Sequence, residues 1–325
     1  MQNSLPLVSV IMPVLNESDH LRQSVAAVLR QDLVGEFLIA LGPSTDNTNA
    51  IAEELAKADS RIKLVMNPRG LTTVGMNQCI AQSNFDFVVR IDAHSEPAEN
   101  YIRRGIEILE ETGADLLGGI MSAKGKTLFQ RAVAWCYTSR FGLGAANYHV
   151  GGKAGEAESA YLGIFRKSAL AAVNGYNEEI IRGEDWDLAQ RIKTSGRLVW
   201  FSPELSVTYW PRTSWQGLVK QFYSTGVWRG DLTKADPNRA SLRYFIPPIL
   251  VATSVLGFFL AAFGFYWGWL PLVSYIVAVI LIGFGSKLAP VPLVLATMHF
   301  SWGFGFLIGY FRGARGTLDR SRIVG

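Results

Sequence analysis

Cysteine is scarce in this sequence, with only Cys79 and Cys136 among 325 residues. Neither belongs to a Cys-x-x-Cys pair, so there is no zinc-ligand pattern and no disulfide framework of a small secreted domain. The first seven residues also lack the positive start and apolar run of a signal peptide. We therefore expect the N-terminal part of the chain to stay in the cytoplasm, where thiols remain reduced.

Charge is also limited, since Asp, Glu, Lys and Arg make up 18% of the chain and the formal net charge is +4. The basic residues are dispersed, whereas nucleic-acid binding favours a concentrated basic stripe. The charge pattern therefore argues against a nucleic-acid partner. Hydrophobic residues instead reach 49%, and the mean hydropathy of +0.18 is high for a purely soluble protein. Membrane lipids are the favoured partner.

Long apolar runs occur near the C-terminus, at residues 244–266, 270–285 and 291–311. The first and last are long enough to cross a bilayer, which takes about 20 residues, and the middle run is marginal. Arginines stand just before the first run and just after the last, and both groups favour the cytoplasmic side. Three full spans would place the two ends of this region on opposite sides of the membrane, so they cannot put both groups of arginines in the cytoplasm. We expect three spans because all three runs are apolar, with two spans and a re-entrant or interfacial middle segment as the alternative.

The first 235 residues alternate β-rich apolar runs with helical patterns. The expected strands are 8–14, 36–41, 61–66 and 85–91. The expected helices are 19–30, 70–82 and 101–113, together with a helix that is capped at 44–46 and ends at 57. This alternation predicts an α/β fold with a Rossmann-like, mostly parallel sheet. Residues 124–155 have no clear period and could form a membrane-surface helix, an acceptor-cleft wall or an ordinary packed helix.

Polar residues follow three of the expected strands, namely Asn16, Asp46 and Asp92. In parallel sheets ligands collect beyond the carboxyl ends of the strands, so these residues point to one site. Asp92 and His94 place a carboxylate and an imidazole two positions apart, where they could serve one divalent ion, Mn²⁺ or Mg²⁺, that clamps a diphosphate. Taken alone, such a pair is more typical of a helix cap or turn and an exposed loop imidazole, and the surrounding motifs reverse that interpretation.

Three motifs in order resemble the GT-A glycosyltransferases of family 2. They are V-S-V-I-M-P-V-L-N-E at 8–17, D-A-H at 92–94 and G-E-D-W-D-L at 183–188. The D-A-H variant and the apolar C-terminal tail look most like the branch of succinoglycan-type exopolysaccharide glucosyltransferases. The resemblance implies a GT-A catalytic domain at residues 1–235, followed by a membrane region at 236–325, and a nucleotide-sugar donor.

The resemblance implies that Asp185 is the general base, with Glu184 as the reserve candidate and Trp186 on the acceptor or diphosphate side. A sugar hydroxyl is a poor nucleophile, and a carboxylate within hydrogen-bond reach removes its proton as the new bond forms. Both acids could also be first-turn residues stabilised by a helix dipole, and the two interpretations are compatible. A single displacement at the anomeric carbon would invert its configuration.

Several residues match donor-binding positions of the family. Pro13, Leu15 and Glu17 correspond to the nucleoside pocket, and Asp46 is retained in the S-T-D after the second strand. The acidic pair that commonly precedes it is replaced by Leu-Gly-Pro at 41–43. The resemblance therefore leaves the nucleotide open, with a UDP-sugar as the default.

Arg69 follows the third strand and is either a cation near the donor or a solvated loop charge. Gln221, Trp228 and Arg229 loosely resemble the Q-x-x-R-W segment of processive members, which lies near the diphosphate or the acceptor. Here six residues separate the glutamine from the tryptophan and the arginine comes last, which argues against processive synthesis. An amphipathic helix against the membrane is the alternative.

Together these features predict an inverting, metal-dependent, membrane-bound glycosyltransferase. It would move a sugar from a nucleotide diphosphate donor to a hydroxyl of a lipid-linked or cell-surface glycan. One alternative is a polyprenyl-phosphate sugar synthase, whose phosphate acceptor needs no base. The other is a non-catalytic membrane protein that binds nucleotide sugars.

Overall fold

The computed structural model describes residues 5–143 and 147–314, which divide into two compact units. The first unit holds residues 5–122 and 147–209, and the second holds 123–143 and 210–314. Residues 210–235, which the sequence predicts to close the catalytic domain, lie in the second unit with the apolar helices. The expected boundary at residue 235 stays a prediction.

The first unit is built on a nine-stranded mixed sheet with the order β3-β2-β1-β4-β8-β6-β9-β5, in which β7 pairs with β9. The strands are β1 Val8–Val14, β2 Val34–Leu41, β3 Ile62–Met66, β4 Phe87–Arg90, β5 Ser95–Pro97, β6 Leu116–Ala123, β7 Gly155–Glu156, β8 Ile164–Arg166 and β9 Val199–Tyr209. The first four strands pair in parallel, and the others join by antiparallel pairing. The predicted parallel sheet is therefore confirmed for the N-terminal half.

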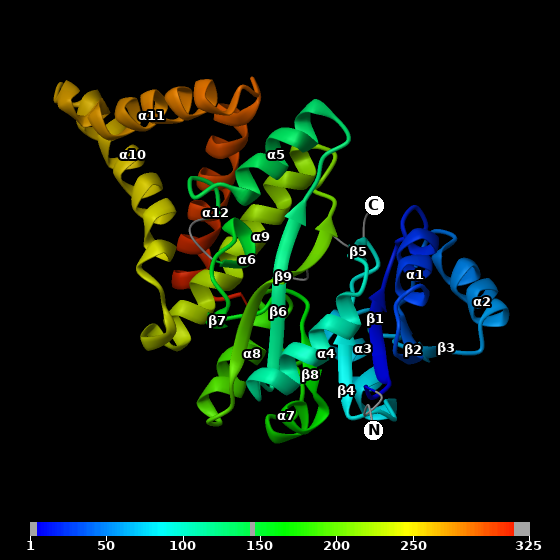
Figure 1. The fold of residues 1–325 in the computed structure, drawn as a ribbon. Coiled ribbons are helices and arrows are strands. Elements are labelled where there is room, and N and C mark those ends of the chain that lie inside the picture. The colour runs from blue at the N-terminus through cyan, green and yellow to red at the C-terminus, as the bar shows by residue number, and fades with distance from the viewer. Residues whose placement is uncertain (1–4, 144–146, 315–325) are drawn as a thin grey trace. The chain divides into compact units, whose positions relative to one another are not determined.

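Helices cover both faces of this sheet (Figure 1). They are α1 Leu21–Leu29, α2 Thr48–Ala58, α3 Thr72–Gln82, α4 Tyr101–Thr112, α6 Asn147–Val150, α7 Lys167–Ala172 and α8 Glu184–Thr194. Residues of α1, α2 and α4 share one hydrophobic core, and residues of α3, α7 and α8 share another. Val10 and Met12 of β1 enter the first core and Ile11 enters the second. A strand buried on both faces explains the continuous apolar run in the sequence.

The second unit is helical. It contains α5 Leu128–Thr138, α9 Trp215–Ala235, α10 Ile246–Ala262, α11 Leu270–Ser286 and α12 Val291–Arg312, with short 3-10 turns at Pro237–Arg239, Leu242–Phe245 and Tyr266–Trp269. Three continuous helical segments are long and apolar enough to cross a membrane: Leu242–Ala262, Tyr266–Ser286 and Val291–Arg312. The middle run is marginal from its sequence, but its 3-10 turn extends it to 21 residues, the same length as the first.

Close packing of α9 on α12 depends on glycine. Gly226 and Gly230 of α9 lie against the backbone of α12, and Gly305 and Gly309 of α12 lie against the backbone of α9. Both pairs have the Gly-x-x-x-Gly spacing that lets helices approach closely in membranes. A Cβ atom at any of the four would collide with a carbonyl oxygen of the facing helix. The segment 124–155, which the sequence leaves open, contains α5, which also packs on α12.

Candidate active site

Hydrogen bonds join the loops that follow β1 and β2. Asn16 has a φ of 54°, in the left-handed region that asparagine tolerates better than most residues. Its Oδ1 accepts a hydrogen bond from the Thr45 backbone N–H at 2.8 Å, and its own N–H donates to Ser44 Oγ at 3.1 Å. The polar residues after two strands are therefore held together, as the strand-end argument predicts.

Asp46 also organises these loops. Its carboxylate accepts from the backbone N–H of Thr48 at 3.0 Å and from that of Ser18 at 3.2 Å. Partial burial works against the charged form, but the hydrogen bonds of Thr48 and Ser18 outweigh it and lower the pKa of Asp46. The carboxylate thus shapes the rim of the site, and its predicted contact with the donor stays a prediction.

Five of the residues expected at the donor or the metal line one pocket. The pocket is bordered by Pro13, Val14, Leu15, Glu17, Asn67, Gly70, Thr72, Asp92 and His94. It lies at the carboxyl ends of β1, β3 and β4, where the sequence places the site. Arg69 is not among the lining residues, and its guanidinium pairs with Glu178 at 3.0 Å. The structure thus brings together Pro13, Leu15, Glu17, Asp92 and His94.

His94 is oriented by two neighbours. Its Nδ1 lies 3.0 Å from Glu17 Oε1, and its ring packs edge-on against Tyr209 with centroids 5.9 Å apart. An ionised carboxylate can only accept, so this contact calls for a proton on Nδ1, and in a neutral imidazole the lone pair then lies on Nε2. Within residues 5–143 and 147–314, no three His, Cys, Asp or Glu side chains cluster closely enough to hold an ion alone.

A buried arginine that the motifs do not include lies between Asp92 and the start of α8. Arg90, the last residue of β4, is 1% exposed. Its Nε donates to Asp92 Oδ1 at 3.0 Å, its Nη2 lies 3.3 Å from Glu184 Oε1, and its Nη1 donates to Asp185 Oδ1. Burial opposes its charge, but the Asp185 and Asp92 carboxylates raise its pKa well above the usual value. A charged residue inside an apolar strand, two positions before Asp92, is the signal that could have found it.

The predicted base lies on α8. Gly183 precedes the helix with a φ of 82°, which favours glycine, and Glu184 and Asp185 occupy the first helical turn beside the positive end of the helix dipole. The Asp185 side chain is 26% exposed and that of Glu184 is 11% exposed, so Asp185 is the more accessible of the two. Trp186 follows on the same turn.

The remaining predicted residues are in the second unit. Gln221, Trp228 and Arg229 belong to α9, where Trp228 is buried and the Arg229 guanidinium lies 4.6 Å from the centre of the Tyr244 ring. Their proposed role near the acceptor or the diphosphate stays a prediction.

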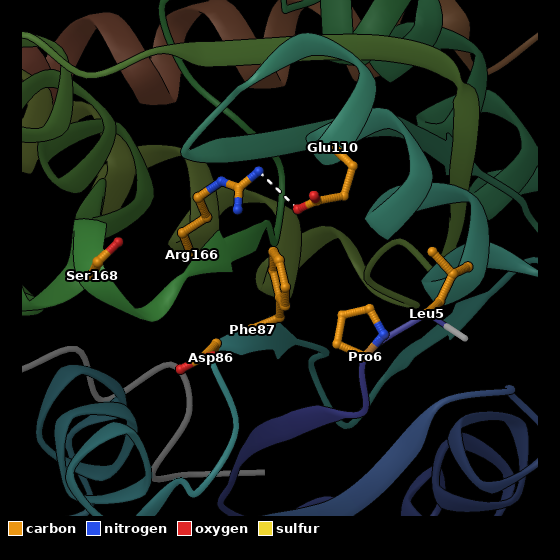
Figure 2. Close-up of a pocket in the computed structure, with 7 residues that line it drawn as sticks. All are labelled: Leu5, Pro6, Asp86, Phe87, Glu110, Arg166 and Ser168. Carbon is orange, nitrogen blue, oxygen red and sulfur yellow. Dashed lines mark ion pairs between the residues drawn. The ribbon is translucent and has the colours of Figure 1, made fainter. Parts of the chain in front are cut away.

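A larger cavity of about 570 Å³ opens at the other end of the sheet. Figure 2 shows its lining residues, Leu5, Pro6, Asp86, Phe87, Glu110, Arg166 and Ser168. It adjoins the amino ends of β1 and β4, whereas Asp92 follows the carboxyl end of β4. Arg166 there pairs with Glu110 at 2.9 Å and donates to two backbone carbonyls. These contacts stabilise the fold, and we place the chemistry at the strand-end pocket.

Comparison with solved structures identifies the fold as GT-A. The mannosyltransferase PcManGT from Pyrobaculum calidifontis, solved with GDP-Man and Mn²⁺, superposes with a TM-score of 0.61 at 15% identity, over 95% of this chain and 88% of that one. TarS residues 1–349 from S. aureus superposes with a TM-score of 0.52 at 16% identity, over 93% and 90% of the two chains. These two structural similarities establish the GT-A fold of this chain.

Sequence comparison then gives the family. The family model described as glycosyl transferase family 2 matches residues 9–173. The succinoglycan biosynthesis protein ExoA of Rhizobium meliloti (strain 1021) is 31% identical over 91% of this chain and 93% of its own length. The chain belongs to glycosyl transferase family 2, and it is a glycosyltransferase with C-terminal apolar helices that indicate membrane association. The alternative of a non-catalytic binding protein is thereby disfavoured.

Proposed function

We propose that this glycosyltransferase transfers a sugar with inversion from a nucleotide diphosphate to a hydroxyl of a lipid-linked or cell-surface glycan. The observation that carries the proposal is the link between two predicted sites. Asp92 lines the strand-end pocket, and it shares the Arg90 guanidinium with Asp185 on α8. A donor-side carboxylate and an acceptor-side carboxylate are therefore joined through one side chain.

Asp185 acts as the general base in this proposal. The acceptor oxygen forms a bond to the anomeric carbon while the bond from that carbon to the diphosphate oxygen breaks, and the hydroxyl proton passes to the Asp185 carboxylate. Glu184 is less exposed and is the reserve candidate. Because attack and departure take place on opposite faces of the anomeric carbon in one step, the configuration inverts.

Asp92 and His94 would hold a divalent cation. Both line the pocket, and Glu17 contacts Nδ1 of His94, so that a neutral imidazole would offer Nε2 to the cation. Mg²⁺ is usually held by one or two carboxylates together with substrate phosphates, so the Asp92 carboxylate fits a site that the donor completes, and the His94 imidazole would be a further ligand. A bound Mn²⁺ or Mg²⁺ would neutralise charge on the departing diphosphate. The Mn²⁺ in the mannosyltransferase complex supports the use of a divalent cation.

Pro13, Leu15 and Glu17 would line the nucleoside side of the pocket. The relatives offer different donors and acceptors. PcManGT was solved with GDP-Man. A protein of Methanococcus voltae, 23% identical over 69% of this chain and 73% of its own length, is named dolichyl N-acetyl-alpha-D-glucosaminyl phosphate 3-beta-D-2,3-diacetamido-2,3-dideoxy-beta-D-glucuronosyltransferase. We propose a UDP-sugar as the default donor and GDP-mannose as the main competitor. The exopolysaccharide and lipid-linked names support a glycan acceptor at the membrane.

The catalytic unit would face the cytoplasm, with Leu242–Ala262, Tyr266–Ser286 and Val291–Arg312 as three spans. Confinement to the membrane surface would raise the effective concentration of a lipid-linked acceptor without extra contact energy.

A donor screen tests the proposal. The full-length protein in detergent is heated with UDP-sugars and GDP-mannose, with and without Mn²⁺, since a bound ligand raises Tm by mass action. A metal-dependent Tm increase for one nucleotide sugar, and transfer of that sugar to a glycan lipid, would support it. Donors that bind equally well in excess chelator would overturn the metal role. Transfer to a polyprenyl phosphate would favour the synthase alternative.

A further inference from the structure

We propose that Arg90 is a positioning residue that fixes the acceptor-side carboxylate of Asp185 relative to the donor-side carboxylate of Asp92. The inference rests on the proposed function and adds a residue that none of the three motifs contains. Arg90 itself is too buried to meet a substrate, at 1% exposure. Its effect must therefore pass through the carboxylates that it contacts.

The guanidinium connects two elements that are distant in the sequence. Arg90 and Asp92 belong to β4 and its following turn, while Glu184 and Asp185 begin α8 more than ninety positions later. Arg90 Nε faces Asp92, Nη2 faces Glu184, and Nη1 faces Asp185. A planar guanidinium holds its N–H groups in a fixed fork, so carboxylates on different nitrogens are held at a set separation and orientation.

The three carboxylates around Arg90 require a positive charge between them. Asp92, Glu184 and Asp185 bring three carboxylates to one region, and like charges this close repel. The single buried guanidinium offsets that repulsion and allows the donor side and the acceptor side to lie together. The Tyr176 ring, 5.9 Å from the guanidinium carbon, packs against the same cation.

Lysine cannot reproduce this geometry. It would keep the positive charge, but an ammonium group is a point donor and lacks the fork that addresses three carboxylates at once. Arg90→Lys should therefore retain much of the electrostatic support while it loosens Asp185. Catalysis is sensitive to such loosening, since a misplacement of about 1 Å can cost about 100-fold in rate.

A double-mutant cycle on the full-length protein provides the test. The turnover number kcat for sugar transfer is measured for the wild type, Arg90→Lys, Asp185→Asn and the double variant, together with Tm and the donor Kd. If Arg90 acts by positioning the Asp185 carboxylate, the Asp185→Asn variant has already lost the group on which Arg90 acts. The double variant should then fall no more than about threefold below Asp185→Asn, although Arg90→Lys alone loses about 10- to 100-fold in kcat.

Arg166→Lys is the matched control. Arg166 is also an arginine that holds a carboxylate and two carbonyls, and it lies at the amino end of β4. Its replacement should lower Tm with little loss of kcat, and any loss should multiply with that of Asp185→Asn.

Multiplicative losses for Arg90→Lys and Asp185→Asn would overturn the proposal, because they would mean that Arg90 does not act through Asp185. If Arg90→Lys does not fold, Arg90→Gln takes its place in the cycle. If neither variant folds, Arg90 is only a core residue and the proposal is wrong. Full kcat in Asp185→Asn is a different outcome, since it refutes the base assignment of the proposed function itself.

Discussion

The Glu17 carboxylate lies 3.0 Å from Nδ1 of His94, across 77 positions of sequence, and both residues line the strand-end pocket. Outer partners of this kind fix the tautomer of a ligating histidine and typically contribute about 10- to 100-fold to metal affinity. Glu17→Gln should therefore raise the Mn²⁺ concentration needed for half-maximal activity by about that factor. The measurement is a metal titration of turnover. Glu54→Gln, which removes an exposed pair with Arg22, is the control and should leave the titration unchanged.

Asp92 should be required for metal-dependent turnover. Asp92→Asn keeps the size of the side chain beside Arg90 but removes the charge that pairs with the guanidinium and that the proposed divalent ion would use. We expect kcat to fall by more than about 100-fold and donor binding to lose its metal dependence. Asp32→Asn, which removes an exposed pair with Arg103, should behave as wild type. Wild-type activity in Asp92→Asn, or full activity in excess chelator, would remove the metal from the mechanism.

Glu36 should make stability depend on pH. Burial would raise its pKa, but hydrogen bonds from Lys63, Ser9 and Asn84 outweigh it and lower the pKa to about 2. A lowered pKa in the folded state gives stability that is complete above the unfolded value near 4.5 and is lost as the pH falls toward 2. The contribution is about 3 kcal/mol. The free energy of unfolding, followed in urea at pH 7 and pH 3, should fall more in the wild type than in Glu36→Gln. Equal losses would contradict this assignment.

The α9 and α12 interface should not tolerate side chains at its glycines. A Cβ at Gly309 would meet the Val227 carbonyl of α9, so Gly309→Ala must push the helices apart. We expect Tm of the full-length protein to drop by several degrees, because a destabilisation of about 1 kcal/mol shifts Tm by about 2–4 °C in a chain of 150–250 residues. Gly285→Ala in α11, where a Cβ meets nothing within 4 Å, is the matched control. Similar Tm values for the two variants would show that the close approach is unimportant.

The parts of the fold that depend on local sequence patterns could be predicted from the sequence. Val8–Val14 is apolar throughout because β1 is buried on both faces, and the first four helices follow their hydrophobic periods closely. The antiparallel half of the sheet was not predicted. Its strands β7 and β8 contain two and three residues, too few to produce a period, and their pairing depends on distant partners.

The site residues that belong to sequence motifs could be predicted from the sequence. Pro13 lies next to the end of β1, and Glu17 and Asp92 follow strands that the pattern identifies, so their meeting in one pocket follows from the parallel topology. The contacts of Arg90 with α8 could not be foreseen, since they depend on tertiary packing between β4 and a helix far along the chain. The hydrogen bond from the Ser18 backbone N–H to the Asp46 carboxylate likewise depends on the packing of two loops that are distant in the sequence.

The most direct test of the central claim compares kcat for sugar transfer in Asp185→Asn and wild type, with donor Kd measured alongside. Removal of a general base typically costs about 10²- to 10⁴-fold, so kcat should fall by that factor while donor Kd stays unchanged. The wild-type product, examined by NMR, should have the anomeric configuration opposite to that of the donor. Undiminished kcat in Asp185→Asn, or a product with retained configuration, would contradict single displacement with Asp185 as the base.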